Sequence, residues 1–71
     1  MKVIINNKKV EKSYEDICAD LGFLSYVHFV RVTSANTISY TLGKPDEVRA
    51  LLAACEEKGY KPAKSLIDAC R

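Results

Sequence analysis

The chain has 71 residues, a length that corresponds to one small domain near the lower limit for a single stable hydrophobic core. Hydrophobic residues make up 48% of the chain and charged residues 28%, a composition that argues against intrinsic disorder. No apolar run approaches the roughly 20 residues that a membrane span requires, and Lys2 precedes only a short apolar run. We therefore expect a single cytoplasmic domain over residues 1–71 that does not contact a membrane.

The N-terminal residues are predicted to form a β-hairpin. Residues 1–6 have the alternation of a strand. Asn6 and Asn7 indicate a turn, because asparagine tolerates a left-handed backbone. Residues 8–12 then suit a short returning strand, with Val10 as its one apolar side chain.

A short helix is expected after this hairpin. Ser13 is a good N-cap residue, and Asp16 three residues later can complete an arrangement similar to a capping box. Gly22 offers a left-handed stop. The apolar positions recur at helical spacing and form one stripe: Tyr14, Ile17, Cys18 and Leu21.

A second hairpin is predicted over residues 24–42. Residues 24–32 are the most apolar stretch and are rich in β-branched and aromatic residues. Residues 33–37 form a polar turn in which Asn36 suits the left-handed position. Arg31 is the only charged residue of this hairpin. In the first strand, alternation places Tyr26, His28, Val30 and Val32 on one face and Val27, Phe29 and Arg31 on the other. In the return strand, the apolar residues Ile38, Tyr40 and Leu42 alternate with Ser39 and Thr41.

The clearest helix runs from Pro45 to Gly59. Proline presets the backbone angle of the first turn, and two acidic residues follow it at the positive end of the helix dipole. Gly59 again offers a left-handed stop. The apolar stripe of this helix is Val48, Leu51, Leu52 and Cys55.

A last short helix is predicted to open at Pro62, so the element order is ββαββαα. We expect an α+β fold in which a four-stranded, mainly antiparallel sheet carries the helices on one face. The stripe of the last helix is Ala63, Leu66, Ile67 and Cys70.

The cysteines and the single histidine are enough for a zinc site by number but not by spacing. Structural zinc sites usually bring ligands in pairs two to four residues apart, and no such pair occurs. Each cysteine also falls on the apolar stripe of a predicted helix, so we expect reduced cysteines packed in the core. The residues weighed for this site are Cys18, His28, Cys55 and Cys70.

Catalysis is not indicated. Nothing in the spacing places His28 beside a thiol, and a cysteine nucleophile needs a base within hydrogen-bond reach. No phosphate-binding loop or nucleophile motif is present. We expect no catalytic residue, no metal, no cofactor and no enzymatic activity.

Basic residues gather at both ends of the chain. Residues 1–12 contain four lysines and one glutamate, and residues 58–71 contain three lysines, one arginine and one aspartate. If the ends are neighbours, these cations form one basic surface, and Tyr26 and Tyr40 would supply stacking for nucleic-acid bases. The pI of about 8.5 lies below the value above 9 that is typical of nucleic-acid-binding domains. Binding of nucleic acid is therefore an alternative that we expect to be weak and salt-dependent.

The first third of the chain resembles the start of bacterial multi-ubiquitin-type domains. The resemblance is carried by VIINNKKV at residues 3–10, SYEDI at residues 13–17 and Leu-Gly at residues 21–22. It implies a β-grasp-like, ubiquitin-like start and a protein that works by surface recognition. The chain departs from that family at its end, where two helices stand in place of further strands. Ala-Cys-Arg at residues 69–71 replaces the flexible di-glycine tail of the modifiers, so conjugation through this C-terminus is not supported.

The second hairpin is the expected contact surface, because it holds apolar or aromatic groups on a face that no predicted helix covers. Aromatic and arginine residues are common anchors at interfaces. We expect a non-catalytic protein-interaction module, an adaptor or inhibitor, that binds a protein partner through this surface or pairs with itself as a dimer. The alternatives are a nucleic-acid-binding regulator that uses the basic termini and a phage or mobile-element inhibitor of a host defence protein. The predicted partner-binding residues are Tyr26, His28, Arg31 and Tyr40.

Overall fold

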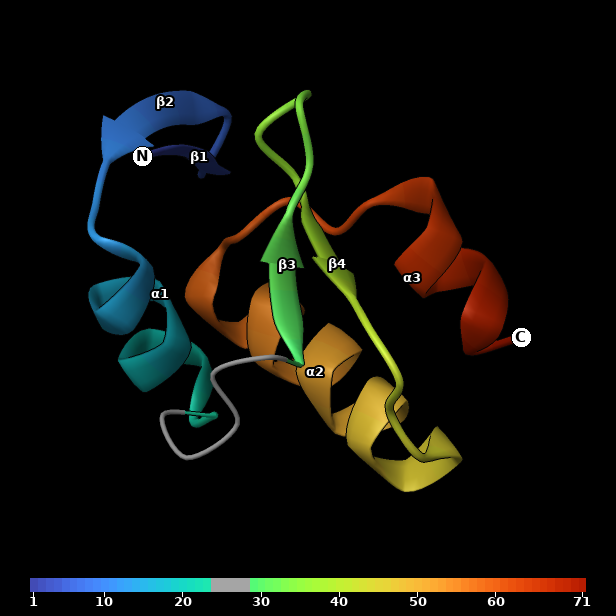
Figure 1. Cartoon of the computed structure of the whole chain (residues 1–71). Helices are drawn as coiled ribbons and strands as arrows, with labels where there is room; N and C mark the ends of the chain where they lie inside the picture. Colours follow the sequence, from blue (N-terminus) through green and yellow to red (C-terminus); the bar gives the residue numbers. More distant parts are fainter. Residues whose placement is uncertain (24–28) are drawn as a thin grey trace.

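A computed structural model of the chain describes residues 1–23 and 29–71 (Figure 1). It contains two hairpins and three helices, which confirms the expected small α+β class. None of the described helices is long and apolar enough to cross a membrane. The elements in chain order are β1 (Lys2–Ile5), β2 (Lys8–Glu11), α1 (Tyr14–Leu21), β3 (Val30–Val32), β4 (Ile38–Tyr40), α2 (Pro45–Lys58) and α3 (Lys64–Ala69).

The hairpins form two separate two-stranded antiparallel sheets, β1 with β2 and β3 with β4. The prediction of a single four-stranded sheet is therefore wrong for the described residues. The reason lies in residues 59–63, which we call the crossing segment. This segment occupies the backbone edges that β1 and β4 would otherwise have used to pair with each other.

The crossing segment hydrogen-bonds to both hairpins. The Lys61 N–H donates to Ile4 O at 3.1 Å, and the Ile38 N–H donates to Lys61 O at 2.9 Å. At its start, Gly59 O accepts from the Asn6 N–H at 2.8 Å. Figure 1 shows the segment passing behind the β3–β4 hairpin on its way from α2 to α3. Across both sheets, the backbone order is therefore β2, β1, crossing segment, β4 and β3.

The last helix begins later than predicted. Pro62 does not open it, because residues 61–63 are extended along β4, with an isolated bridge between Pro62 and Ile38. Ala63 is the N-cap residue, and α3 starts at Lys64. Proline fixes φ near −65°, a value that suits both a first helical turn and an extended edge. Only the tertiary contact with β4 decides between the two.

The β3–β4 hairpin turns its aliphatic side chains inward. Val30 and Ile38 are fully buried, whereas Arg31 is exposed. The expected uncovered apolar face is therefore wrong for the described strands, because each short strand leaves only one residue on the outward side. The register pairs Val30 with Tyr40, Arg31 with Ser39 and Val32 with Ile38.

The return strand is shorter than predicted and ends at Tyr40. Leu42 does not continue the alternation: its φ is 52° and its side chain is 98% exposed. Gly43 follows in close contact with the Phe29 ring, where an added Cβ would overlap the ring carbons. The chain therefore leaves the strand early in order to pass over this buried ring. Residues 24–28 of the other predicted strand lie outside the described residues.

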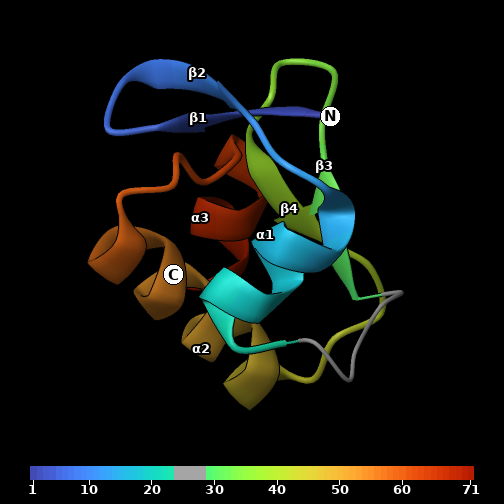
Figure 2. The same ribbon diagram turned by 90° about the vertical axis from the view of Figure 1, so that its left-hand side faces the viewer.

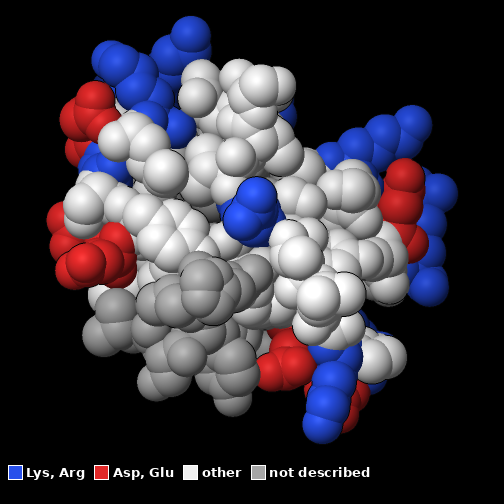
Figure 3. Space-filling view, viewed as in Figure 1, with Lys and Arg blue, Asp and Glu red and all other residues white. Residues whose placement is uncertain are grey.

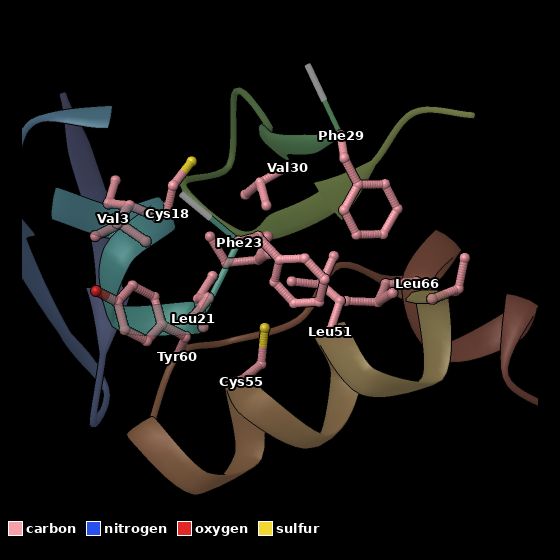
Figure 4. Packing of buried hydrophobic residues seen from close by; sticks show 13 residues of the cluster. Val3, Cys18, Leu21, Phe23, Phe29, Val30, Leu51, Cys55, Tyr60 and Leu66 are labelled. Carbon is pink, nitrogen blue, oxygen red and sulfur yellow. The ribbon is translucent and has the colours of Figure 1, made fainter. Parts of the chain in front are cut away.

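One core is shared by both hairpins and all three helices (Figure 4). α1 packs against α2 and α2 against α3, below the β1–β2 hairpin in Figure 2. The predicted stripes of α1 and α2 are confirmed, but Ile67 of the α3 stripe is 39% exposed. The buried members of the core are Val3, Ile17, Cys18, Leu21, Phe23, Phe29, Val30, Ile38, Val48, Leu51, Cys55, Tyr60 and Leu66.

The turns and helix ends follow their local signals. Ser13 is confirmed as an N-cap, because its Oγ accepts from the Asp16 N–H at 3.1 Å. The capping glycines end α1 and α2 as predicted, and both have φ near 80°. The residues that take the predicted left-handed backbone are Asn6, Asn7, Gly22, Asn36 and Gly59.

The two capping glycines provide a test of the crossing segment. A left-handed backbone costs a non-glycine residue about 1–2 kcal/mol, so Gly22→Ala and Gly59→Ala should both lower the free energy of unfolding. Space is open around Gly22, whereas a Cβ at Gly59 would overlap the Asn6 side chain and disturb the bond to Gly59 O. In urea denaturation, we expect Gly59→Ala to lower the free energy of unfolding by about 1 kcal/mol more than Gly22→Ala does. Equal losses would contradict a tight junction between β1 and the crossing segment.

Candidate functional site

The outward face of the β3–β4 hairpin carries very little charge. Arg31 is the only charged residue in residues 29–43. Its side chain is exposed, and no ion pair joins it to another described residue. Figure 3 shows a mainly uncharged surface over β3 and β4, with acidic and basic groups gathered at its margins. The face is therefore a nearly neutral surface with one unpaired cation.

Small hydroxyl groups accompany Arg31 on this face. The register places Ser39 directly opposite Arg31, and the Ser39 and Ser65 Oγ atoms lie 3.0 Å apart. This hydrogen bond ties β4 to α3 and holds the hairpin against the helix. A fixed backbone behind Arg31 lowers the entropic cost of ordering its side chain on a partner.

β3 presents a free backbone edge. The Thr41 N–H donates to Phe29 O at 2.8 Å and the Thr33 N–H to Thr37 O at 2.9 Å, so alternate residues of β3 point toward β4. The backbone groups of Val30 and Val32 consequently point away from β4. Val30 O accepts from the Tyr14 hydroxyl. The N–H and C=O of Val32 have no hydrogen-bond partner among the described residues.

A pocket of about 270 Å³ opens along this edge. Its walls come from the N-terminus, from the start of α1 and from all three residues of β3. Its lining is mixed: apolar and aromatic side chains lie beside polar groups, and one arginine contributes to it. The residues that line it are Met1, Tyr14, Val30, Arg31 and Val32.

Tyr14 acts as a neutral donor at this pocket. Burial, followed by the hydrogen bond with Cys18, raises the pKa of Tyr14 to about 12, and nearby Arg31 opposes that rise. The phenol therefore keeps its proton throughout the physiological range. Its hydroxyl remains available to hold the Val30 carbonyl and to fix the distance between α1 and β3.

The two predicted site residues that the structure describes, Arg31 and Tyr40, lie on opposite faces of the β3–β4 hairpin. Arg31 is exposed on the outward side, but Tyr40 points inward, is half-buried and lies 6.2 Å from Phe29 between ring centroids. Tyr26 and His28 lie outside the described residues. The structure therefore brings Arg31 together with a different set of side chains from the predicted one.

Sequence reasoning missed Met1 and Tyr14 as members of the site. The sequence places Tyr14 on the apolar stripe of its helix. The only signal of a role at the pocket is that Tyr14 is the first residue of that stripe. Met1 offered no signal, because its place beside β3 follows from the tertiary position of β1. Both are brought to the pocket by contacts that are distant in sequence.

The cysteines lie in the core rather than in a reactive setting. Cys18 and Cys55 are buried as predicted, and Cys70 is half-buried, with its Sγ 3.7 Å from Val48 O. Burial raises the pKa of Cys18 and raises that of Cys55 to about 12, so neither thiol is ionised at neutral pH. Within residues 1–23 and 29–71, no group of three or more cysteine, histidine or acidic side chains could hold a metal ion.

A polar cluster around Asp20 joins separate elements of the fold. Asp20 Oδ2 accepts from Lys12 Nζ at 2.7 Å and from the Tyr60 hydroxyl at 2.6 Å. These hydrogen bonds, with Lys12 first, hold the pKa of Asp20 below its usual value. The cluster joins α1 to the end of the first hairpin and to the crossing segment. Lys12 and Tyr60 donate to the same Asp20 oxygen, so one carboxylate holds all three residues together.

Comparison with protein-family models found no match to this chain. Searches of curated proteins and of solved structures also found no significant match.

The Asp20 cluster predicts a dependence of stability on pH. Because the pKa of Asp20 is lowered in the folded state, its contribution is present above the ordinary value of about 3.9 and disappears as the pH falls through the lower folded value. We expect Asp20→Asn to be less stable than wild type at neutral pH. Its free energy of unfolding should also fall less steeply between about pH 5 and pH 2.

Urea denaturation across that pH range measures both effects. Glu57→Gln is the matched control, because Glu57 is an exposed carboxylate with no ion pair to a described residue. It should keep the wild-type pH slope. An Asp20→Asn slope equal to that of wild type would show that the Lys12 and Tyr60 contacts do not stabilise the folded state.

Proposed function

We propose that this chain is a non-catalytic protein-interaction module that binds a partner protein through the β3–β4 hairpin. The observation that carries the proposal is the free edge of β3, which runs beside a partly apolar pocket and an exposed, unpaired Arg31. Unpaired strand edges and arginine anchors are both recurrent features of protein recognition. The bound surface therefore consists of the outward hairpin face, the β3 edge and the pocket.

A binding role fits the chemistry of the nucleophiles better than a catalytic role. A thiol nucleophile must ionise in an accessible, electropositive setting. Cys18 and Cys55 are buried, and burial raises the pKa of both thiols. The tyrosine at the pocket, Tyr14, is held as a protonated hydrogen-bond donor. These groups support the integrity of the fold and the shape of the surface.

The ubiquitin-like resemblance belongs to the same proposal. It is supported by the β1–β2 hairpin and by the eight-residue helix α1 that follows it. Surface recognition is the activity that this resemblance implies. A phage or mobile-element inhibitor would be one form of such a module, since an inhibitor needs only a binding surface.

Nucleic-acid binding is a second candidate, favoured by one observation. The crossing segment places Lys61 beside β1, through the bond from Lys61 N–H to Ile4 O, and so brings basic residues from both ends of the chain near one another. Against it, Lys12 is paired with Asp20, and on the face drawn in Figure 3 the basic groups are one central group and several dispersed at the margins, not one stripe. If several lysines contact phosphates, the affinity for nucleic acid would fall by orders of magnitude between about 50 and 200 mM salt.

Selection from a displayed library of protein fragments tests the proposal. We expect enriched binders whose affinity falls about tenfold or more in Arg31→Ala, because a partly desolvated arginine is a typical hot spot. Arg49→Ala is the matched control: Arg49 is an exposed arginine on α2, and its ion pair with Asp46 lies within one helix. Its binding should match wild type in biolayer interferometry.

Two results would contradict the proposal. One is a set of binders whose affinity is unchanged by Arg31→Ala but reduced by Arg49→Ala. The other is the absence of protein binders together with tight binding to DNA or RNA oligonucleotides that persists at about 200 mM salt. The second result would establish the nucleic-acid candidate in its place.

A further inference from the structure

We propose that β3 binds an extended peptide segment as an added strand, with an apolar peptide side chain in the pocket and an acidic peptide residue against Arg31. This inference rests on the proposed function and specifies the class of its partner. Strand addition combines main-chain hydrogen bonds, which provide affinity, with pockets for alternate side chains, which provide specificity. The three residues of β3 provide both an open backbone edge and a neighbouring pocket.

The other strand edges of the described chain are less suited to this role. The crossing segment already binds the inner edges of the two hairpins, those of β1 and β4. The outer edge of β2 remains, but three of its four residues are charged and exposed: Lys8, Lys9 and Glu11. Charged side chains are a common protection of an edge against pairing. β3 is therefore the described edge that combines an open backbone with aliphatic side chains.

The backbone of β3 defines where a peptide strand would start and stop. The N–H and C=O of Val32 point outward without a partner among the described residues. Two residues earlier, Val30 O is already bound by the Tyr14 hydroxyl. A peptide strand would therefore pair around Val32 and end where Tyr14 closes the edge. This short ladder needs additional side-chain contacts for affinity.

The pocket supplies one of those contacts. Its volume of about 270 Å³ lies just below the range of about 300–1,000 Å³ that is typical of small-molecule sites. A space of this size, with Val30, Val32 and Tyr14 in its lining, can hold one aliphatic or aromatic side chain. Met1, which is 52% exposed, and Tyr14 form the wall that faces β3. An anchoring side chain would bury these apolar groups together with Val30 and Val32.

Arg31 supplies the other contact and argues against a second copy of the chain. In a symmetric antiparallel pair of β3 strands centred on Val32, the two Arg31 side chains would lie diagonally across the strand pair, where long side chains remain within reach of each other. Like charges in that position repel each other, whereas an opposite charge is favourable. Arg31 has no acidic partner among the described residues, and the chain carries a net charge of +2. An acidic peptide therefore fits the edge better than a homodimer.

Random-peptide display on the intact protein tests this inference. We expect selected peptides to share an apolar residue with an acidic residue at a neighbouring position. Arg31→Ala should weaken these peptides about tenfold or more, and Arg31→Glu should redirect the selection toward basic peptides. Arg49→Glu is the matched control, because it reverses a charge on α2, and it should leave the selection unchanged. Amide signals of β3 should shift on peptide addition in NMR spectra.

N-methylation of the best synthetic peptide tests the strand geometry without altering the protein. Removing one peptide N–H at a time should abolish binding at alternate positions only, because alternate groups of a strand face its neighbour. Peptides whose binding is unaffected by every N-methylation, or whose NMR shifts lie on α2 and α3, would overturn strand addition.

Two further outcomes separate this inference from the function on which it rests. If no peptide is selected but folded fragments bind in an Arg31-dependent manner, strand addition is overturned and the interaction module stands. If sedimentation shows a dimer that is lost when Val32→Pro removes the outward N–H, the partner is a second copy and the acidic-peptide assignment is overturned. The absence of both peptide and fragment binders would overturn both proposals.

Discussion

The crossing segment is the constraint on which the rest of the fold depends. The strands of the two hairpins do not pair with each other, and apart from one backbone hydrogen bond from the Ile4 N–H to Asn36 O at 3.0 Å, residues 59–63 join the hairpins with backbone hydrogen bonds on both sides. Lys61 donates its N–H to Ile4 O and accepts from the Ile38 N–H through its C=O, so the backbone of this one residue links the two sheets. The helices then close around this junction: α2 leads into it and α3 leaves from it, and Tyr60 within it is buried and bound to Asp20. A domain of this size has little core to lose, so the junction decides whether the hairpins share one core.

The same arrangement determines which surface is left for recognition. Because the crossing segment covers the inner edges of both hairpins, the outer edges are those of β2 and β3. β2 is protected by charge, and β3 is open beside a pocket to which Met1 and Tyr14 are brought by the position of the first hairpin. The function proposed for the chain is thus a consequence of its topology. Residues with no common sequence motif form one site because the N-terminal hairpin and α1 are held beside β3.

Local features of the fold were predictable, and long-range features were not. The cap at Ser13 and the stripes of α1 and α2 depend on neighbours within one or two turns, so the sequence contained the full signal. Pro62 was misassigned, because its pairing partner in β4 is distant along the chain. Of the described site residues, Arg31 lies on the surface, as expected. Tyr40 packs inward instead, because the register and length of the strands decide which face of the hairpin a side chain occupies. The contribution of Tyr14 required knowledge of where α1 lies relative to β3.

Amide hydrogen exchange in the partner-free protein tests most directly the claim that the crossing segment joins the hairpins and leaves β3 open. The Ile38 and Lys61 amides donate to backbone carbonyls at this junction and should exchange slowly, near the limit set by global unfolding. The Val32 amide points away from β4 and should exchange much faster, although it belongs to the same hairpin as Ile38. Protection of Val32 equal to that of Ile38 in a monomeric sample would show that the edge is already covered. Fast exchange at Lys61 would show that the junction does not hold.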